Sequence, residues 1–170
     1  MNKRKKQLSL FNEKQFSRTF GGDVRGKRKT KRPLSTKLPI HLILRANHQV
    51  ARKDMAKVFA YRDQKNIRIL QSVAKKFQIK VYQSVFNYTH LHLIIVIPSR
   101  KAYIGFVRVL AAKLSALAGL KRGVLFALRP YTRVANWGRE FQGLLIYIKK
   151  NFLQAIGGVD VLYSEIPIGF

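Results

Sequence analysis

The chain of 170 residues contains no cysteine and only 7 acidic residues. Without cysteine, neither a disulfide framework nor a thiolate zinc site can form. The scarcity of carboxylates argues against a nuclease whose two metal ions are held by clustered Asp and Glu side chains. No apolar run approaches the length needed to cross a bilayer, and no apolar segment follows the charged residues after Met1. We therefore expect neither a membrane span nor a secretory signal.

Positive charge is what the sequence has in excess. Its 34 Lys and Arg residues give a formal net charge of +27. A net charge of this size gives information about binding partners and not about the fold, because it attracts polyanions. Nucleic acid is the expected partner, and a membrane is not. The 47% of hydrophobic residues are enough for the core of one domain.

The basic residues are dense in the first 37 positions, where glycines and Pro33 interrupt the chain and no apolar period is sustained. We expect residues 1–37 to form a flexible basic arm that follows phosphates. A tail that only adds solubility is the alternative. Residues 38–158 are expected to form the folded domain, and residues 159–170 a C-terminal tail.

Apolar patterning after Leu38 predicts seven elements. The predicted strands cover residues 39–45, 79–86, 90–97 and 126–134, and the predicted helices cover residues 63–78, 101–118 and 139–152. The order β-α-β-β-α-β, followed by a helix, is that of the ferredoxin-like split βαβ arrangement, an α+β fold with an antiparallel sheet. RNA-binding modules and nucleases share this fold, so the fold alone does not decide the function.

Two histidines give the first indication of chemistry. His90 and His92 lie in a run rich in Ile, Leu and Val, and residues two apart on a strand point to the same face. Two imidazoles on one face make half of a site for a divalent metal. Histidines that are only hydrogen-bonded within the fold are the alternative. His41 is expected in the first strand, in a packing role or in support of the metal.

The last predicted helix offers the other groups that such a site needs. Its apolar stripe leaves Tyr147 and Asn151 on a shared flank, four residues apart. A metal held by His90, His92 and the Asn151 amide could polarise a phosphodiester, and the Tyr147 phenol could then attack the phosphorus. An ordinary surface tyrosine and a residue at the helix end are the alternatives. Tyr88 and Tyr131 are competing phenols.

These residues resemble those of a known family. The run His90-Leu91-His92, followed by Tyr147-Ile148-Lys149-Lys150-Asn151 near the C-terminus, is similar to the motifs of the single-tyrosine HUH transposases, in the branch associated with repeated extragenic palindromes. Arg32-Pro33 and the run from Arg129 to Gly138 add to the likeness, which spans about residues 32–157. Thr89 and Phe152 depart from the residues that are frequent in the family at these positions.

The resemblance implies a ferredoxin-like nuclease that cleaves and rejoins single-stranded or hairpin DNA with Mg²⁺ or Mn²⁺, through a 5′-phosphotyrosine, and that acts as a homodimer in many members. It implies a bacterial cytoplasmic protein with no small organic cofactor. Carried over by residue, Tyr147 is the nucleophile, and His90, His92 and Asn151 are the metal ligands. The residues expected to bind DNA are basic: Lys27, Arg28, Lys29, Lys31, Arg32, Arg129, Arg133, Lys149 and Lys150.

Two other functions fit part of this pattern. A transposase descendant without catalysis would bind nucleic acid on the same fold. An RNA-binding protein associated with ribosomes would explain the charge but not His90 and His92 together with Tyr147. An RNA-binding module is expected to carry paired aromatics on its central strands, whereas the third predicted strand carries histidines and aliphatic residues.

Overall fold

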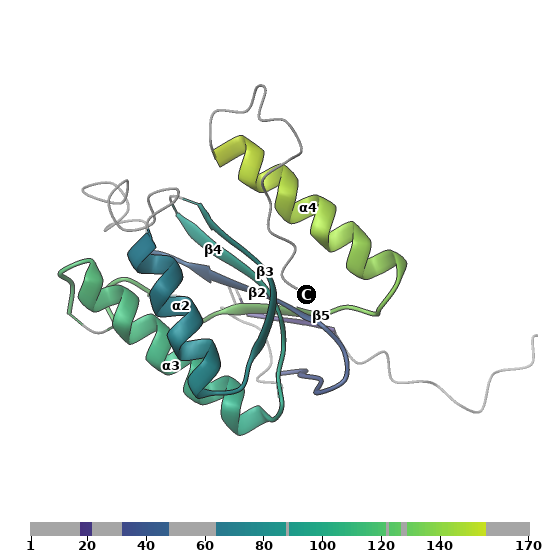
Figure 1. Ribbon diagram of the computed structural model, residues 1–170, viewed down its shortest axis with the longest axis horizontal. Coiled ribbons are helices and arrows are strands. Elements are labelled where there is room, and N and C mark those ends of the chain that lie inside the picture. Colours follow the sequence, from purple (N-terminus) through teal and green to yellow (C-terminus); the bar gives the residue numbers. More distant parts are fainter. Residues whose placement is uncertain are drawn as a thin grey trace, which may run out of the picture.

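The structure is a computed structural model that describes residues 18–21, 32–47, 64–87, 89–121, 123–126 and 129–155. Its elements (Figure 1) follow in chain order: β1 (Thr19–Phe20), β2 (Ile40–Arg45), α2 (Gln64–Lys76), β3 (Lys80–Asn87), β4 (His90–Val96), α3 (Arg100–Leu117), β5 (Tyr131–Val134) and α4 (Arg139–Ala155). No helix in these ranges is long and apolar enough to cross a membrane.

The strands form one sheet in the order β1-β5-β2-β4-β3, and every neighbouring pair is antiparallel. The first and third predicted strands, β2 and β4, lie in the centre, as the split βαβ arrangement requires. The predicted α+β class with an antiparallel sheet is therefore confirmed.

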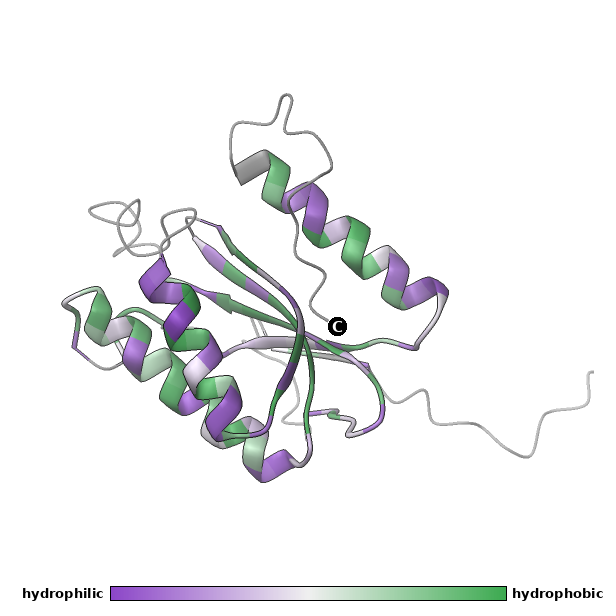
Figure 2. Cartoon of the chain, viewed as in Figure 1, coloured by the Kyte–Doolittle hydropathy of each residue, from purple (hydrophilic) through white to green (hydrophobic). Residues whose placement is uncertain are grey.

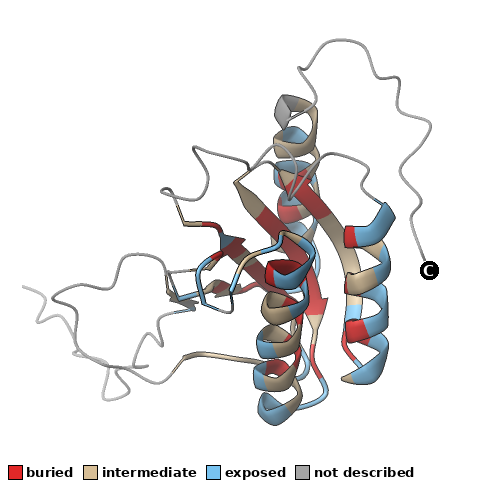
Figure 3. Ribbon diagram, turned by 90° about the vertical axis from the view of Figure 1, so that its left-hand side faces the viewer, coloured by how far each residue is buried: buried red, intermediate tan, exposed pale blue. Residues whose placement is uncertain are grey.

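The helices cover both faces of this sheet, with α2 and α3 on one side and α4 on the other (Figures 1 and 3). Because side chains alternate along a strand, Leu42, Leu44, Leu91 and Leu93 belong to the core under α2 and α3. These leucines are at most 1% exposed. The central strands are thus buried on both faces, which explains why β4 has an almost unbroken apolar sequence.

The smaller core under α4 determines how that helix lies. Leu144 and Ile148 are buried against Val85 and Ile94 of the sheet, and Phe141, Leu145 and Phe152 pack around them. Hydrophilic and hydrophobic residues accordingly alternate along α4 in Figure 2. The predicted apolar stripe is confirmed, and the flank that carries Tyr147 lies outside it.

Part of the segment expected to be a flexible arm is ordered in the sheet. Strand β1 pairs with β5 through Thr19 opposite Arg133 and Phe20 opposite Thr132. Gly21, which follows, has a φ of +104° and lies so close to the Pro130 carbonyl that no Cβ would fit. Residues 1–17 and 22–31 lie outside the described ranges.

Arg32 connects the chain before β2 to the edge of the sheet. Its guanidinium donates hydrogen bonds to the Pro130 carbonyl at 2.7 Å and to Thr132 Oγ1 at 2.8 Å, and lies 4.4 Å from the centre of the Phe20 ring. Burial lowers the pKa of this guanidinium. We predicted that Arg32 contacts DNA; two of its five N–H donors are used within the fold.

We expect Arg32→Ala to lower the free energy of unfolding by about 2–4 kcal/mol, because it removes two charge-assisted hydrogen bonds and a cation–π contact. The matched control is Arg129→Ala, since Arg129 is exposed; this change should alter stability by less than about 0.5 kcal/mol. Urea denaturation measures both. Equal effects of the two changes would mean that the Arg32 contacts do not stabilise the fold.

Strand β5 is shorter than predicted, because it begins at Tyr131 rather than at residue 126. Pro130 has no N–H to donate to a neighbouring strand. Leu125 is fully buried outside the sheet, and its carbonyl accepts a hydrogen bond from the Asn47 N–H. Leu125 therefore belongs to a packed loop and not to a longer strand, and residues 127 and 128 lie outside the described ranges.

Candidate active site

The register of β2 and β4 places both predicted histidines on the face of the sheet toward α4. In this antiparallel pair His92 lies opposite Ile43, and His90 lies opposite Arg45. Residues that are paired directly share a face. His41, two positions before Ile43, is therefore on the same face, so β2 contributes a histidine and an arginine to the site.

His41 and His92 form a buried pair at the centre of the site. They are 3% and 4% exposed, their rings are stacked with centres 5.6 Å apart, and His41 Nε2 lies 3.3 Å from His92 Nδ1. Burial lowers the pKa of each histidine to about 4. The charge of Arg133 lowers the pKa of His41 further, and His41, His90 and Arg45 lower that of His92. Both imidazoles are thus neutral at pH 7, so one ring donates the hydrogen bond and the other accepts it.

His90 has a different environment. The Arg45 Nε–H donates a hydrogen bond to His90 Nε2 at 2.9 Å. Because Nε2 accepts, the neutral ring carries its proton on Nδ1, which faces Thr89 Oγ1. Arg45 thus uses the Nε2 lone pair of His90, a residue that we predicted as a metal ligand.

Tyr147 lies beside the His41–His92 pair within the same chain. Its ring centre is 5.9 Å from that of His41 and 6.2 Å from that of His92, with the rings nearly perpendicular. Tyr147 is nevertheless 47% exposed. Burial of Leu144 and Ile148 fixes the rotation of α4 and leaves Tyr147 at the edge of the helix–sheet contact, where a substrate could reach its phenol.

Asn151 makes its contact within α4. Its side-chain amide donates a hydrogen bond to the Tyr147 carbonyl at 2.9 Å, one turn earlier. No hydrogen bond joins Asn151 to His90 or His92 in the described part of the chain. The structure therefore brings Tyr147 to the histidines, whereas the Asn151 amide group is turned toward its own helix.

As these side chains lie, one atom of the predicted ligand set is occupied by another side chain. Arg45 donates to His90 Nε2, whereas Asn151 uses only an amide N–H in its bond to the Tyr147 carbonyl, so that bond does not occupy its oxygen. Glu140 is the only acidic residue in the described ranges. Across the same ranges, no three His, Asp or Glu side chains are grouped so that they could hold an ion. His92 faces His41 through Nδ1, so its Nε2 remains for a metal, as does the Asn151 oxygen.

We expect Arg45→Gln to raise the affinity for Mn²⁺ by about tenfold or more, since the change removes both a charge-assisted competitor for the His90 lone pair and a positive charge. Isothermal titration of Mn²⁺ into the DNA-free protein measures this. Arg133→Gln controls for charge, because Arg133 acts on His41 but bonds to Glu140. Equal affinities in the two variants would show that charge, and not the His90 contact, limits metal binding.

The basic residues predicted to bind DNA divide into three groups. Arg129 and Lys150 are exposed, and Lys149 is half-buried. Arg133 donates to Glu140 at 2.7 Å; the pKa of this carboxyl is lowered by the Asn136 N–H and then by Arg133. Lys27, Arg28, Lys29 and Lys31 lie outside the described residues.

Sequence reasoning gave Arg45 no role and gave His41 only an uncertain one. The signal was present, because His41, Ile43 and Arg45 alternate along one predicted strand and must share a face. Pairing with β4, which the sequence does not specify, decides that this face is the one with His92. Tyr131 also borders the site, with its ring centre 6.5 Å from that of His41.

One comparison with known proteins gives a match. The chain is similar to the solved structure of a REP-associated tyrosine transposase bound to a REP hairpin, with a TM-score of 0.62, 14% identity, and coverage of 78% of this chain and 76% of that chain. No protein-family model and no curated protein matches the sequence. At this identity the likeness establishes the fold alone: the chain has the fold of a tyrosine transposase.

Proposed function

We propose that this protein binds single-stranded or hairpin DNA and cleaves and rejoins it through Tyr147. The observation that carries the proposal is the position of this exposed phenol beside the buried His41–His92 pair. The hairpin bound by the similar transposase, and the net charge of +27 of this chain, support DNA as the partner.

The chemistry follows from a phenol placed at a phosphodiester. The Tyr147 oxygen attacks phosphorus, the bond from phosphorus to the 3′ oxygen breaks, and the leaving 3′ oxygen takes up a proton. The 5′ phosphate remains on Tyr147 until a 3′ hydroxyl attacks it and restores the DNA strand. Arg45, exposed at the border of the site, supplies positive charge for the phosphate.

The metal and the assembly state belong to the same proposal. The family resemblance implies Mg²⁺ or Mn²⁺ on His90, His92 and Asn151, where it would supply a Lewis acid. Arg45 would have to leave His90 Nε2 before that nitrogen could hold the ion. A homodimer, which the resemblance also implies, is not needed to bring Tyr147 to the histidines. We place the activity in the bacterial cytoplasm, on chromosomal DNA.

A DNA-binding protein without catalysis is the second candidate. The observation in its favour is the engagement of one predicted metal ligand, because Arg45 donates to His90 Nε2. A binder needs the basic surface and the fold, but it has no need for an accessible phenol beside His92.

A covalent-capture assay separates the two functions. End-labelled single-stranded and hairpin DNAs are incubated with the full chain in Mg²⁺, in Mn²⁺ or with a chelator, and run on a denaturing protein gel. Label that migrates with the protein, and requires the metal, supports the transferase. If no member of a broad hairpin library gives an adduct, although the DNAs bind, the binding function is correct.

A further inference from the structure

Trp137 is the single tryptophan of the chain, and it lies in the turn between β5 and α4. It is 44% exposed, so a large part of an indole faces solvent. A ring of this size is normally covered, because its burial contributes strongly to stability. None of the chemistry proposed above uses this residue.

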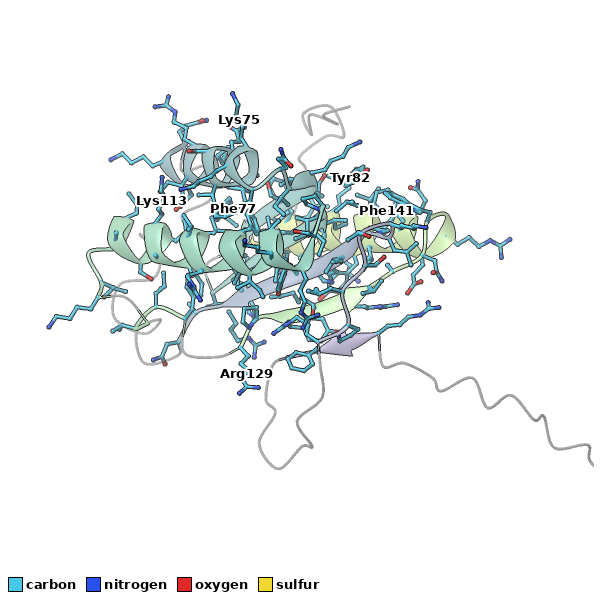
Figure 4. All side chains as sticks on the ribbon, turned by 90° about the horizontal axis from the view of Figure 1, so that it is seen from below. Lys75, Phe77, Tyr82, Lys113, Arg129 and Phe141 are labelled. Atoms are coloured by element: carbon cyan, nitrogen blue, oxygen red, sulfur yellow. The ribbon has the colours of Figure 1, made fainter. Side chains whose placement is uncertain are left out.

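The indole is held firmly despite its exposure. Its Nε1–H donates to the Lys37 carbonyl at 2.9 Å, and its ring centre is 4.9 Å from that of Phe141 and 5.5 Å from that of Tyr82. Tyr82 of β3 and Phe141 of α4 lie close together (Figure 4), with ring centres 5.5 Å apart. These contacts fix the orientation of Trp137, so a ligand that binds the exposed ring does not first have to order it.

The surroundings of Trp137 are positively charged. Lys37, Lys80 and Arg139 are exposed on three segments that meet at this cluster, and the Lys80 Nζ lies 4.9 Å from the centre of the Tyr82 ring. Glu140 is the one carboxylate side chain in the described ranges, and Arg18 and Arg133 pair with it. A fixed aromatic ring among exposed cations is complementary to a flat aromatic ligand that carries negative charge.

The distance from Trp137 to Tyr147 along α4 is short enough for one DNA strand to contact both residues. From Arg139, two residues after Trp137, to Tyr147 the helix rises by about 12 Å at 1.5 Å per residue. Because phosphates in a nucleic-acid strand are several ångströms apart, a few nucleotides span this distance. A strand with a phosphate at Tyr147 could therefore place a nearby base at Trp137.

We propose that Trp137 is a stacking platform for an unpaired base of single-stranded DNA. The proposal rests on DNA as the partner in the proposed function, but not on cleavage. A rigid, exposed ring beside lysines stacks with any base, since every base has a π-face, while the cations hold the adjoining phosphates. Trp137 thus contributes affinity without sequence preference.

The sole tryptophan makes a direct test possible. The full chain is titrated with a short oligothymidylate and with an oligomer of the same length that lacks bases, and the indole emission is recorded. Stacking predicts strong quenching by the oligothymidylate and little by the abasic strand. Equal quenching by both strands, or none at saturation, would overturn the proposal, as would a change in emission with protein concentration alone, because a second copy would then cover the ring.

Variants measure the contribution of the ring. Trp137→Ala should weaken binding of the oligothymidylate on the order of tenfold to a hundredfold, and Trp137→Phe should restore most of it. The matched control is Ile104→Ala, since Ile104 is 48% exposed on α3, across the sheet; it should bind as the wild type does. Undiminished binding by Trp137→Ala refutes the platform. Quenching without a covalent adduct would leave the platform standing and remove the transferase, and an adduct without quenching would do the reverse.

Discussion

Replacing Tyr147 by phenylalanine should abolish the covalent adduct, with a loss of cleavage rate on the order of 10⁴-fold or more, because the nucleophile is gone. Binding of DNA should stay within about twofold of the wild type, as expected for an exposed side chain. The phenylalanine ring keeps the edge contacts with His41 and His92. The labelled-DNA gel measures the adduct, and a filter-binding titration measures the affinity.

Tyr131→Phe is the matched control for this change. Tyr131 is the other phenol among the described residues that borders the site, and it lies on β5 rather than on α4. The competing Tyr88 lies outside the described residues. If Tyr147 is the nucleophile, Tyr131→Phe still forms the adduct. An adduct that persists in Tyr147→Phe and disappears in Tyr131→Phe would transfer the role to Tyr131, and loss in both would indicate that the two rings position the DNA together.

Most elements of the fold could be predicted from the local spacing of apolar residues. The elements with long apolar patterns, such as α3 and β4, lie within one residue of their predicted bounds. Strand β1 has only two residues, and its pairing depends on β5, more than a hundred positions later. The role of Arg32 as a connection to Pro130 and Thr132 depends on the same long-range contact, so no pattern near Arg32 could indicate it.

In the site, too, features of single elements could be predicted, and contacts between elements could not. The spacing of His90 and His92 and the flank of α4 with Tyr147 are properties of single elements, so the sequence was sufficient to select them. The contact of Arg45 with His90, and that of His41 with His92, come from the register of two strands. Side-chain rotation is not encoded in spacing either, and for that reason the Asn151 contact with its own helix could not be foreseen.

Lowering the pH from 7 to 5 should destabilise the protein strongly, because the His41–His92 pair resists protonation in the folded state. The pKa of each histidine is about 4 when folded, against about 6.5 when unfolded. The unfolded chain therefore binds protons first, and the stability that the neutral pair contributes is complete above pH 6.5 and lost as the pH falls toward 4. The loss is about 1.4 kcal/mol per pH unit for each histidine.

Urea denaturation at intervals from pH 7 to pH 5 measures this slope. Glu140 does not contribute to it, because a carboxylate with a lowered pKa loses its stabilising effect only below about pH 4.5. His41→Gln retains an amide that can bond to His92 and removes one of the two titrating rings, so the slope should fall by about half. If His41→Gln leaves the slope unchanged, protonation of the buried pair is not the cause of the loss of stability in acid. The histidines would then take up protons while the protein stays folded.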